Sequence, residues 1–109
     1  MIQQEENKEY YAVIFTSTLT QQDSEEYEKM AEKMEELASK QPGFLGIESA
    51  RNTLGITISY WESLKAIQQW KANIDHQKAQ TLGKKVWYQN YTVRIAKVEQ
   101  EYSLSLIHI

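Results

Sequence analysis

The sequence predicts an α+β fold, a ferredoxin-like split βαβ sandwich with the element order β-α-β-β-α-β. Two observations predict it. Segments rich in aromatic and β-branched residues lie at residues 11–20, 44–51, 55–61 and 86–99, and segments with helical periodicity separate the first from the second and the third from the fourth. The chain has 109 residues, which is the length of one domain.

The first strand is followed by an amphipathic helix. Residues 11–20 are aromatic or β-branched along most of their length, which is typical of a buried strand. Asp23 can accept hydrogen bonds from the first amides of a helix that we expect over residues 24–41. The apolar residues of this helix form one stripe: Tyr27, Met30, Ala31, Met34, Leu37 and Ala38. Its opposite face is charged, and pairs such as Glu36–Lys40 indicate a solvated surface.

A hairpin and a second helix follow. Pro42 and Gly43 end the first helix, and residues 44–51 and 55–61 then pair as an antiparallel hairpin because their connection is short. Ser63 can cap the second helix. The buried stripe of that helix is Leu64, Ile67, Trp70 and Ile74.

The second half of this helix is less regular in sequence. Residues 73–75 predict a kink, after which a short helical piece runs from His76 and ends at Gly83. The last strand, residues 86–99, is the longest and the most aromatic. We divide the chain into a flexible tail over residues 1–9, a domain over residues 10–102 and a tail over residues 103–109. The final tail is apolar and fits either a swapped edge strand or sequence that is not native.

One face of the predicted sheet has no cover. Two helices cover one side of a four-stranded sheet, yet the strands are apolar or aromatic on both sides. Monomers rarely expose an apolar patch of more than a few hundred Å². The sequence therefore predicts a homodimer in which two sheets face each other.

Composition excludes several classes of function. Twelve Lys and Arg against fifteen Asp and Glu give a net charge of −3, which argues against a nucleic-acid partner. The mean hydropathy is −0.62, and no apolar run approaches the ~18–20 residues that span a membrane. The chain has no cysteine, so disulfides and thiol chemistry are absent. The amino end lacks the pattern of a signal peptide, so we expect a soluble cytoplasmic protein.

Several motifs together resemble one known family. They are Gln41-Pro42-Gly43-Phe44-Leu45-Gly46, Ile58-Ser59-Tyr60-Trp61, Trp70-Lys71-Ala72 with His76, Trp87-Tyr88, Tyr91 and Val93-Arg94. Over residues 10–102 the chain resembles the antibiotic biosynthesis monooxygenase (ABM) superfamily, whose members are dimeric α+β barrels. That superfamily holds cofactor-free oxygenases that form quinones, heme-degrading enzymes and members without known activity. The resemblance implies a homodimer with a small-molecule ligand.

The heme-degrading branch can be compared residue by residue. Its members use an Asn late in the first strand, a Trp on the second helix and a His that ligates heme ten residues after that Trp. Trp70 matches the Trp, but Gln80 stands at the position of the His and residues 16–18 offer no Asn. His76 would reach an iron only if the expected kink shifts its register. The resemblance therefore disfavours heme and implies that no cofactor is needed.

The cofactor-free branch requires aromatic walls, a base and a group that stabilises an oxyanion. His76 is the natural base because histidine titrates near neutrality, and Trp70 joins it as a candidate catalytic residue. The candidate substrate-binding residues are Tyr60, Trp61, Tyr88 and Arg94. The implied function is the oxidation of a small aromatic, a phenol or a quinol, in a pocket between the second helix and the sheet.

Each candidate also has a plain structural interpretation. Trp61 and Trp70 fit the core between helix and sheet, His76 fits a solvated histidine, and Arg94 fits an ion pair across the sheet. Tyr88 fits the seam of a dimer. A lone core histidine predicts no metal site. The alternative function is a non-catalytic dimer of the same fold that binds a small molecule or has a structural role.

Overall fold

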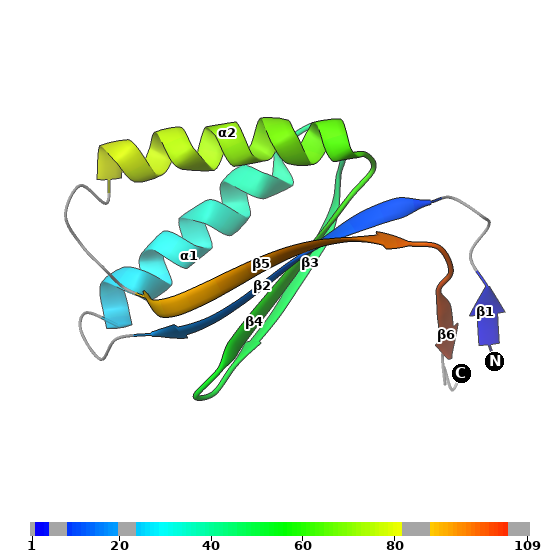
Figure 1. The fold of residues 1–109 in the computed structure, drawn as a ribbon, viewed down its shortest axis with the longest axis horizontal. Helices are drawn as coiled ribbons and strands as arrows, with labels where there is room; N and C mark the ends of the chain where they lie inside the picture. The colour runs from blue at the N-terminus through cyan, green and yellow to red at the C-terminus, as the bar shows by residue number, and fades with distance from the viewer. Residues whose placement is uncertain (1, 5–8, 20–23, 82–87, 105–109) are drawn as a thin grey trace, which may run out of the picture.

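The main body of the protein, described here from a computed structural model, is one antiparallel sheet with two helices on one face (Figure 1). The structure describes residues 2–4, 9–19, 24–81 and 88–104. The sheet order is β3-β4-β2-β5, and the ferredoxin-like fold class is confirmed. The elements are β2 (Tyr10–Leu19), α1 (Ser24–Ser39), β3 (Phe44–Arg51), β4 (Gly55–Trp61), α2 (Leu64–Thr81) and β5 (Tyr88–Val98).

The register of the strands divides the sheet into two faces. Tyr11 of β2 lies opposite Trp61 of β4 and Lys97 of β5, whereas Ile14 lies opposite Ile58 and Arg94. Because successive side chains of a strand point to opposite sides, these two rows lie on different faces. We call the face with Trp61, which the helices cover, the inner face, and the other the open face.

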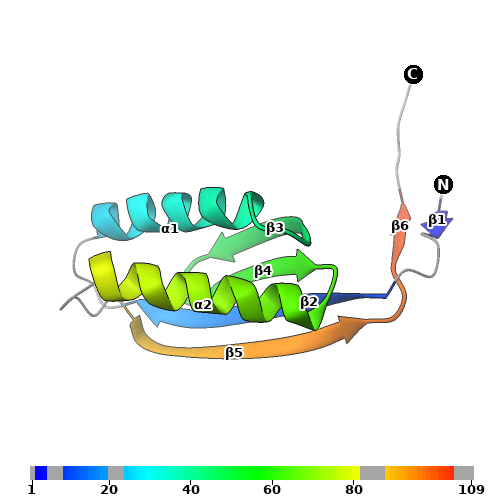
Figure 2. The ribbon, with the colours of Figure 1, turned by 90° about the horizontal axis from the view of Figure 1, so that it is seen from above.

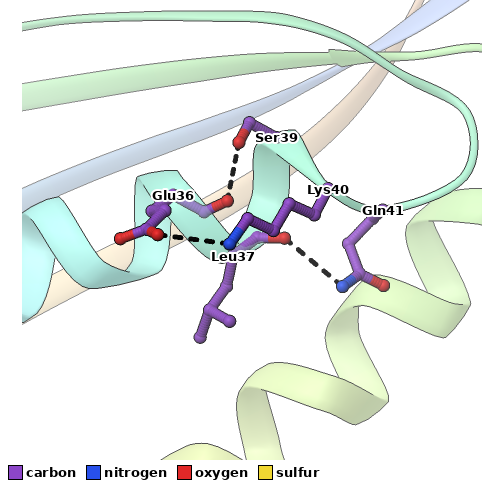
Figure 3. A network of polar contacts seen from close by, with 5 residues as sticks. All are labelled: Glu36, Leu37, Ser39, Lys40 and Gln41. Atoms are coloured by element: carbon purple, nitrogen blue, oxygen red, sulfur yellow. Dashed lines mark hydrogen bonds and ion pairs between the residues drawn. The ribbon is translucent and has the colours of Figure 1, made fainter.

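Side-chain hydrogen bonds and one ion pair cap the carboxyl end of α1 (Figure 3). The Ser39 hydroxyl donates to the carbonyl of Glu36 (2.6 Å), and the Gln41 amide donates to the carbonyl of Leu37 (3.3 Å). The expected pair of Lys40 and Glu36 is confirmed, with Nζ and Oε1 3.2 Å apart. The helix ends at Ser39, two residues earlier than expected, and these side chains provide donors for carbonyls of its last turn. The expected cap at its start, Asp23, lies outside the described residues.

The turn between α1 and β3 requires a glycine. Gly43 has a φ of +84°, which glycine adopts without steric cost. A Cβ at Gly43 would also lie 2.7 Å from the Cβ of Ala66 on α2. The Glu62 amide donates to the Gly43 carbonyl (2.8 Å), so this turn sets where α2 begins.

The helix α2 is capped as expected but is not kinked. The Ala66 amide donates to the hydroxyl of Ser63 (3.1 Å), which confirms the cap. The expected kink at residues 73–75 is wrong, because α2 runs without a break from Leu64 to Thr81. Asn and Asp lower helix propensity somewhat less than glycine and far less than proline, and Ile74 between them packs against the core. Tertiary packing therefore continues the helix.

No helix of the described residues is long and apolar enough to cross a membrane.

The core occupies one end of the inner face. Its buried members come from the end of α1, the end of β4 and the first half of α2: Ala38, Trp61, Ala66, Ile67 and Trp70. Partly buried neighbours, among them Val13, Met34 and Phe44, pack around them. The opposite end of the inner face holds polar residues, among them Ser17 and Arg51.

The two ends of the chain form a small sheet of their own. β1 (Ile2–Gln4) pairs antiparallel with β6 (Tyr102–Leu104), and Figures 1 and 2 show this pair to one side of the main sheet. Residues 2–4 are thus a strand within the stretch for which the sequence predicts a flexible tail. The pairing depends on backbone hydrogen bonds between segments about 100 residues apart, which the polar local sequence does not reveal. Residues 105–109 lie outside the described part.

Candidate functional site

Two stacked tryptophans lie beneath the first half of α2. The rings of Trp61 and Trp70 are stacked with centroids 5.9 Å apart, and the ring of Phe44 meets Trp61 edge-on at 5.4 Å. Trp61 is 0% exposed and Trp70 is 8% exposed. The indole N–H of Trp61 donates to the Ser59 hydroxyl (2.9 Å). The two rings therefore fill the space between α2 and β4, and they form one rigid wall.

A polar atom that the sequence reasoning missed lies on the same helix. The side-chain oxygen of Asn73 is buried and has no hydrogen-bond partner in the described part of the chain. Asn73 is three residues after Trp70, so the two side chains are neighbours on one side of α2. A buried acceptor without a partner is costly, at roughly 1–3 kcal/mol, and such exceptions need an explanation. The position of Asn73 beside Trp70 on the apolar stripe of α2 indicates that its side chain is buried. The kink predicted at residues 73–75 led away from this interpretation.

The sheet separates two of the expected binding residues from the tryptophans. Tyr60 and Arg94 are in register with open-face residues, whereas Trp61 belongs to the inner face. Arg94 lies in a row across the open face with Ile14, Ile58 and Glu48, and it is exposed. Tyr60 and Arg94 therefore do not lie together with Trp61 and Trp70 in one protomer.

Tyr60 belongs to a polar cluster at the end of the open face. Its hydroxyl donates to the Glu48 carboxylate (2.6 Å), and the hydroxyl of Tyr10 donates to Glu101 (2.8 Å). The rings of Tyr10 and Tyr60 meet edge-on at 5.9 Å. The hydrogen bond to Glu48, and then burial, raises the pKa of Tyr60 to about 12. Tyr60 is therefore a proton donor here and not a base.

We expect Glu48→Gln to lower the pKa of Tyr60 toward the ordinary 10.0, because it removes the charged acceptor. Since the folded-state pKa exceeds the unfolded one, the bond stabilises the fold fully below pH 10.0, and this stabilisation is lost as pH rises toward about 12. The measurement is the ultraviolet titration of phenolate, with Tyr60→Phe subtracted to isolate this residue. Glu99→Gln is the control and should leave the titration unchanged. Equal titration in wild type and Glu48→Gln would contradict the assignment.

The remaining candidates fall outside what the structure describes of the side chains. Position 76 is on α2, within the uninterrupted helix, and Tyr88 is the first residue of β5. The side chains of His76 and Tyr88 are not among those described, so their roles remain predictions. Over the described ranges, no group of three His, Cys, Asp or Glu residues could hold a metal ion.

Comparison with known proteins places this arrangement in one family. The family described as antibiotic biosynthesis monooxygenase (ABM) matches residues 10–82, and the chain belongs to it. The chain is 49% identical over 94 residues to the uncharacterized protein YqjZ of Bacillus subtilis (strain 168), a match that covers 84% of this chain and 82% of that protein. The expected family is therefore confirmed.

Two proteins of stated activity have solved structures that share this fold. SnoaB, a cofactor-independent oxygenase from Streptomyces nogalater, matches with a TM-score of 0.56 at 16% identity, over 84% of this chain and 91% of that chain. MhuD, a heme-degrader from Mycobacterium tuberculosis solved with two hemes in its active site, matches with a TM-score of 0.59 at 22% identity, over 81% of this chain and 94% of that chain. At these identities the likeness shows the fold alone.

Proposed function

We propose that the protein is a cofactor-independent monooxygenase that oxidises a small phenol or quinol on the inner face, beneath α2. The observation that carries the proposal is the buried oxygen of Asn73, which lacks a partner beside the Trp61–Trp70 wall. A phenolic O–H donates a hydrogen bond, so a phenol supplies what this oxygen lacks. Membership of the ABM family, and the fold shared with the oxygenase SnoaB, support the proposal.

The reaction balances without an external reductant. A phenol with a free ring position reacts with O2 to give a quinone and water, so one oxygen atom enters the ring and the other leaves in water. The substrate supplies all four electrons. The step that the protein has to favour is formation of the phenolate, because an electron-rich anion transfers an electron to O2 more readily than the neutral phenol does.

The residues then have distinct roles in this proposal. Asn73 accepts a hydrogen bond from one hydroxyl of a quinol and so orients it, and His76 takes the proton from the other hydroxyl. Trp70 borders the pocket, and Trp61, which is 0% exposed, packs behind it. Tyr88 lies opposite Leu19 of β2, whereas Trp61 lies opposite Tyr11, so Tyr88 is at the other end of the sheet and outside this pocket. Tyr60 and Arg94 are separated from this pocket by the sheet.

The proposal also includes a homodimer formed through the open face. The central row of that face has Ile14 and Ile58 in the middle, flanked by Glu48 and Arg94 at the two edges. An apolar centre with a charged rim is the usual anatomy of a protein interface. The partner that this face fits is a second copy of the chain.

We expect the protein to consume oxygen with members of a panel of naphthols and dihydroquinones, without added metal or flavin. Asn73→Leu should lower that rate at least about tenfold, because the leucine cannot accept the phenolic hydrogen bond. The same variant should be more stable by about 1 kcal/mol, because it removes an unpartnered buried acceptor. Asn90→Leu, at an exposed asparagine of β5, is the control and should leave the rate unchanged.

Two results would overturn the proposal. Oxygen consumption no faster than without protein, together with no thermal shift by any aromatic compound, would favour the non-catalytic dimer. A hemin titration tests the heme-degrading alternative, and we expect no sharp Soret band and no change on His76→Ala. Stoichiometric hemin binding that His76→Ala abolishes would instead assign the chain to the heme-degrading enzymes.

A further inference from the structure

A row of four residues crosses the inner face at the end away from the tryptophans. Arg51 of β3 lies opposite Gly55 of β4, Gly55 lies opposite Ser17 of β2, and Ser17 lies opposite Tyr91 of β5. Gly55 and Trp61 are six positions apart on β4, which is about 20 Å of extended strand. This row is therefore distinct from the tryptophan wall.

The guanidinium of Arg51 is held in place on this row. Its Nη1 donates to the backbone carbonyl of Ser17 (3.3 Å), and its Nη2 donates to the Ser17 hydroxyl. The group lies over Gly55, where a Cβ would overlap its atoms. The ring of Tyr27 on α1 lies 5.6 Å from the guanidinium carbon, within the range of a cation–π contact. Glycine on β4, serine on β2 and tyrosine on α1 together fix one orientation of the arginine.

The guanidinium of Arg51 has further N–H donors beyond those bound to Ser17. A guanidinium has five N–H donors, and the two bonds to Ser17 use two of them. The ion pairs of the described residues are Lys40–Glu36 and Lys97–Glu9, so within that part of the chain no carboxylate lies within ion-pair distance of Arg51. Arg51 is also exposed to solvent. A planar fork in a fixed orientation matches the two oxygens of a carboxylate.

An apolar shelf continues from this row along β5. Tyr91 is stacked on Phe15 with ring centroids 5.4 Å apart. Tyr91, Val93 and Ile95 are on the inner face of β5, yet they are 55%, 48% and 54% exposed. The helices contact chiefly β3 and β4, and Figure 2 shows β5 lying beyond α2. We call Phe15, Tyr91, Val93 and Ile95 the apolar shelf.

We infer that Arg51 and the apolar shelf bind a planar aromatic acid. Its carboxylate accepts hydrogen bonds from the guanidinium of Arg51, and its ring rests on Tyr91. Ser17, which the guanidinium contacts, lies opposite Tyr91 on the neighbouring strand, and neighbouring strands are about 4.8 Å apart. A ring attached to the bound carboxylate can therefore reach the Tyr91 ring. This binding site does not depend on the proposed oxygenase activity, because it requires no reaction and lies at the other end of the inner face.

The test is calorimetric titration of the full chain with 2-naphthoate and with 2-naphthamide, its neutral analogue. Neither compound is a phenol, so the outcome is separate from that of the oxygen assay. We expect 2-naphthoate to bind at least about tenfold more tightly, because only it offers a charged acceptor. Equal affinities in the wild type would overturn the inference.

Three variants locate the site. Arg51→Met should abolish the preference for 2-naphthoate, whereas Arg94→Met should keep it, because Arg94 is the other arginine of the chain and lies on the open face. Gly55→Ala retains the charge but displaces the guanidinium from the sheet, and it too should abolish the preference. This second variant tests the site even if Arg51→Met fails to fold. A preference retained in Gly55→Ala or Arg51→Met, or lost in Arg94→Met, would overturn the site.

Discussion

Replacing Trp61 by alanine is expected to lower the free energy of unfolding by about 3–5 kcal/mol, a large share of the roughly 5–15 kcal/mol that stabilises a typical domain. Trp61 is 0% exposed and contacts both Phe44 and Trp70, so the substitution leaves a cavity that its neighbours cannot fill. It also leaves the buried Ser59 hydroxyl without its donor. Urea unfolding followed by circular dichroism measures the change.

Two further substitutions separate packing from hydrogen bonding. Trp61→Phe keeps an aromatic ring but loses the indole N–H, so we expect a smaller loss of about 1–3 kcal/mol. Leu45→Ala removes a side chain that is half exposed and should cost less than about 1 kcal/mol. A Trp61→Ala variant as stable as Leu45→Ala would contradict the placement of the core.

The sequence predicted the elements well where the signal was local. The Ser63 cap and the hairpin of β3 and β4 each depend on residues a few positions apart. The predicted apolar stripe of α1 is only partly correct, because Ala38 is buried but Ala31 is exposed. The prediction of the site failed where it grouped Tyr60 with Trp61. These two are consecutive residues of a strand, so they necessarily point to opposite faces.

Other parts of the site depend on pairings that no local pattern reveals. The face on which Arg94 lies follows from its register with Ile14, about 80 residues earlier in the chain. Arg51 was overlooked because it ends a strand, and its orientation is set by Ser17, which is 34 residues away. The sequence predicts a kink at Asn73, whereas its burial depends on how α2 packs. Register and packing, and not composition, determine which polar groups meet.

The second large effect concerns the open face. We expect sedimentation to give a molar mass of twice 12.8 kDa for the wild-type protein, a dimer, and of 12.8 kDa for Ile14→Arg, a monomer. Ile14 lies in the middle of the open face, between β4 and β5, with Ile58 beside it. A charge at the centre of an interface loses its hydration without gaining a partner, so the dimer should dissociate at least about 100-fold more readily. Sedimentation velocity across a range of micromolar concentrations measures the change.

The control is chosen to carry the same new charge away from the sheet. Ala31→Arg places an arginine at an exposed position of α1, and it should remain a dimer. In a monomer the new arginine at position 14 would be solvated on an uncovered face, so circular dichroism of Ile14→Arg should keep the wild-type spectrum. A wild-type monomer would contradict the dimer itself. A dimeric Ile14→Arg would place the contact elsewhere, because the open face has Ile14 at its centre and cannot pack against a second copy without burying that position.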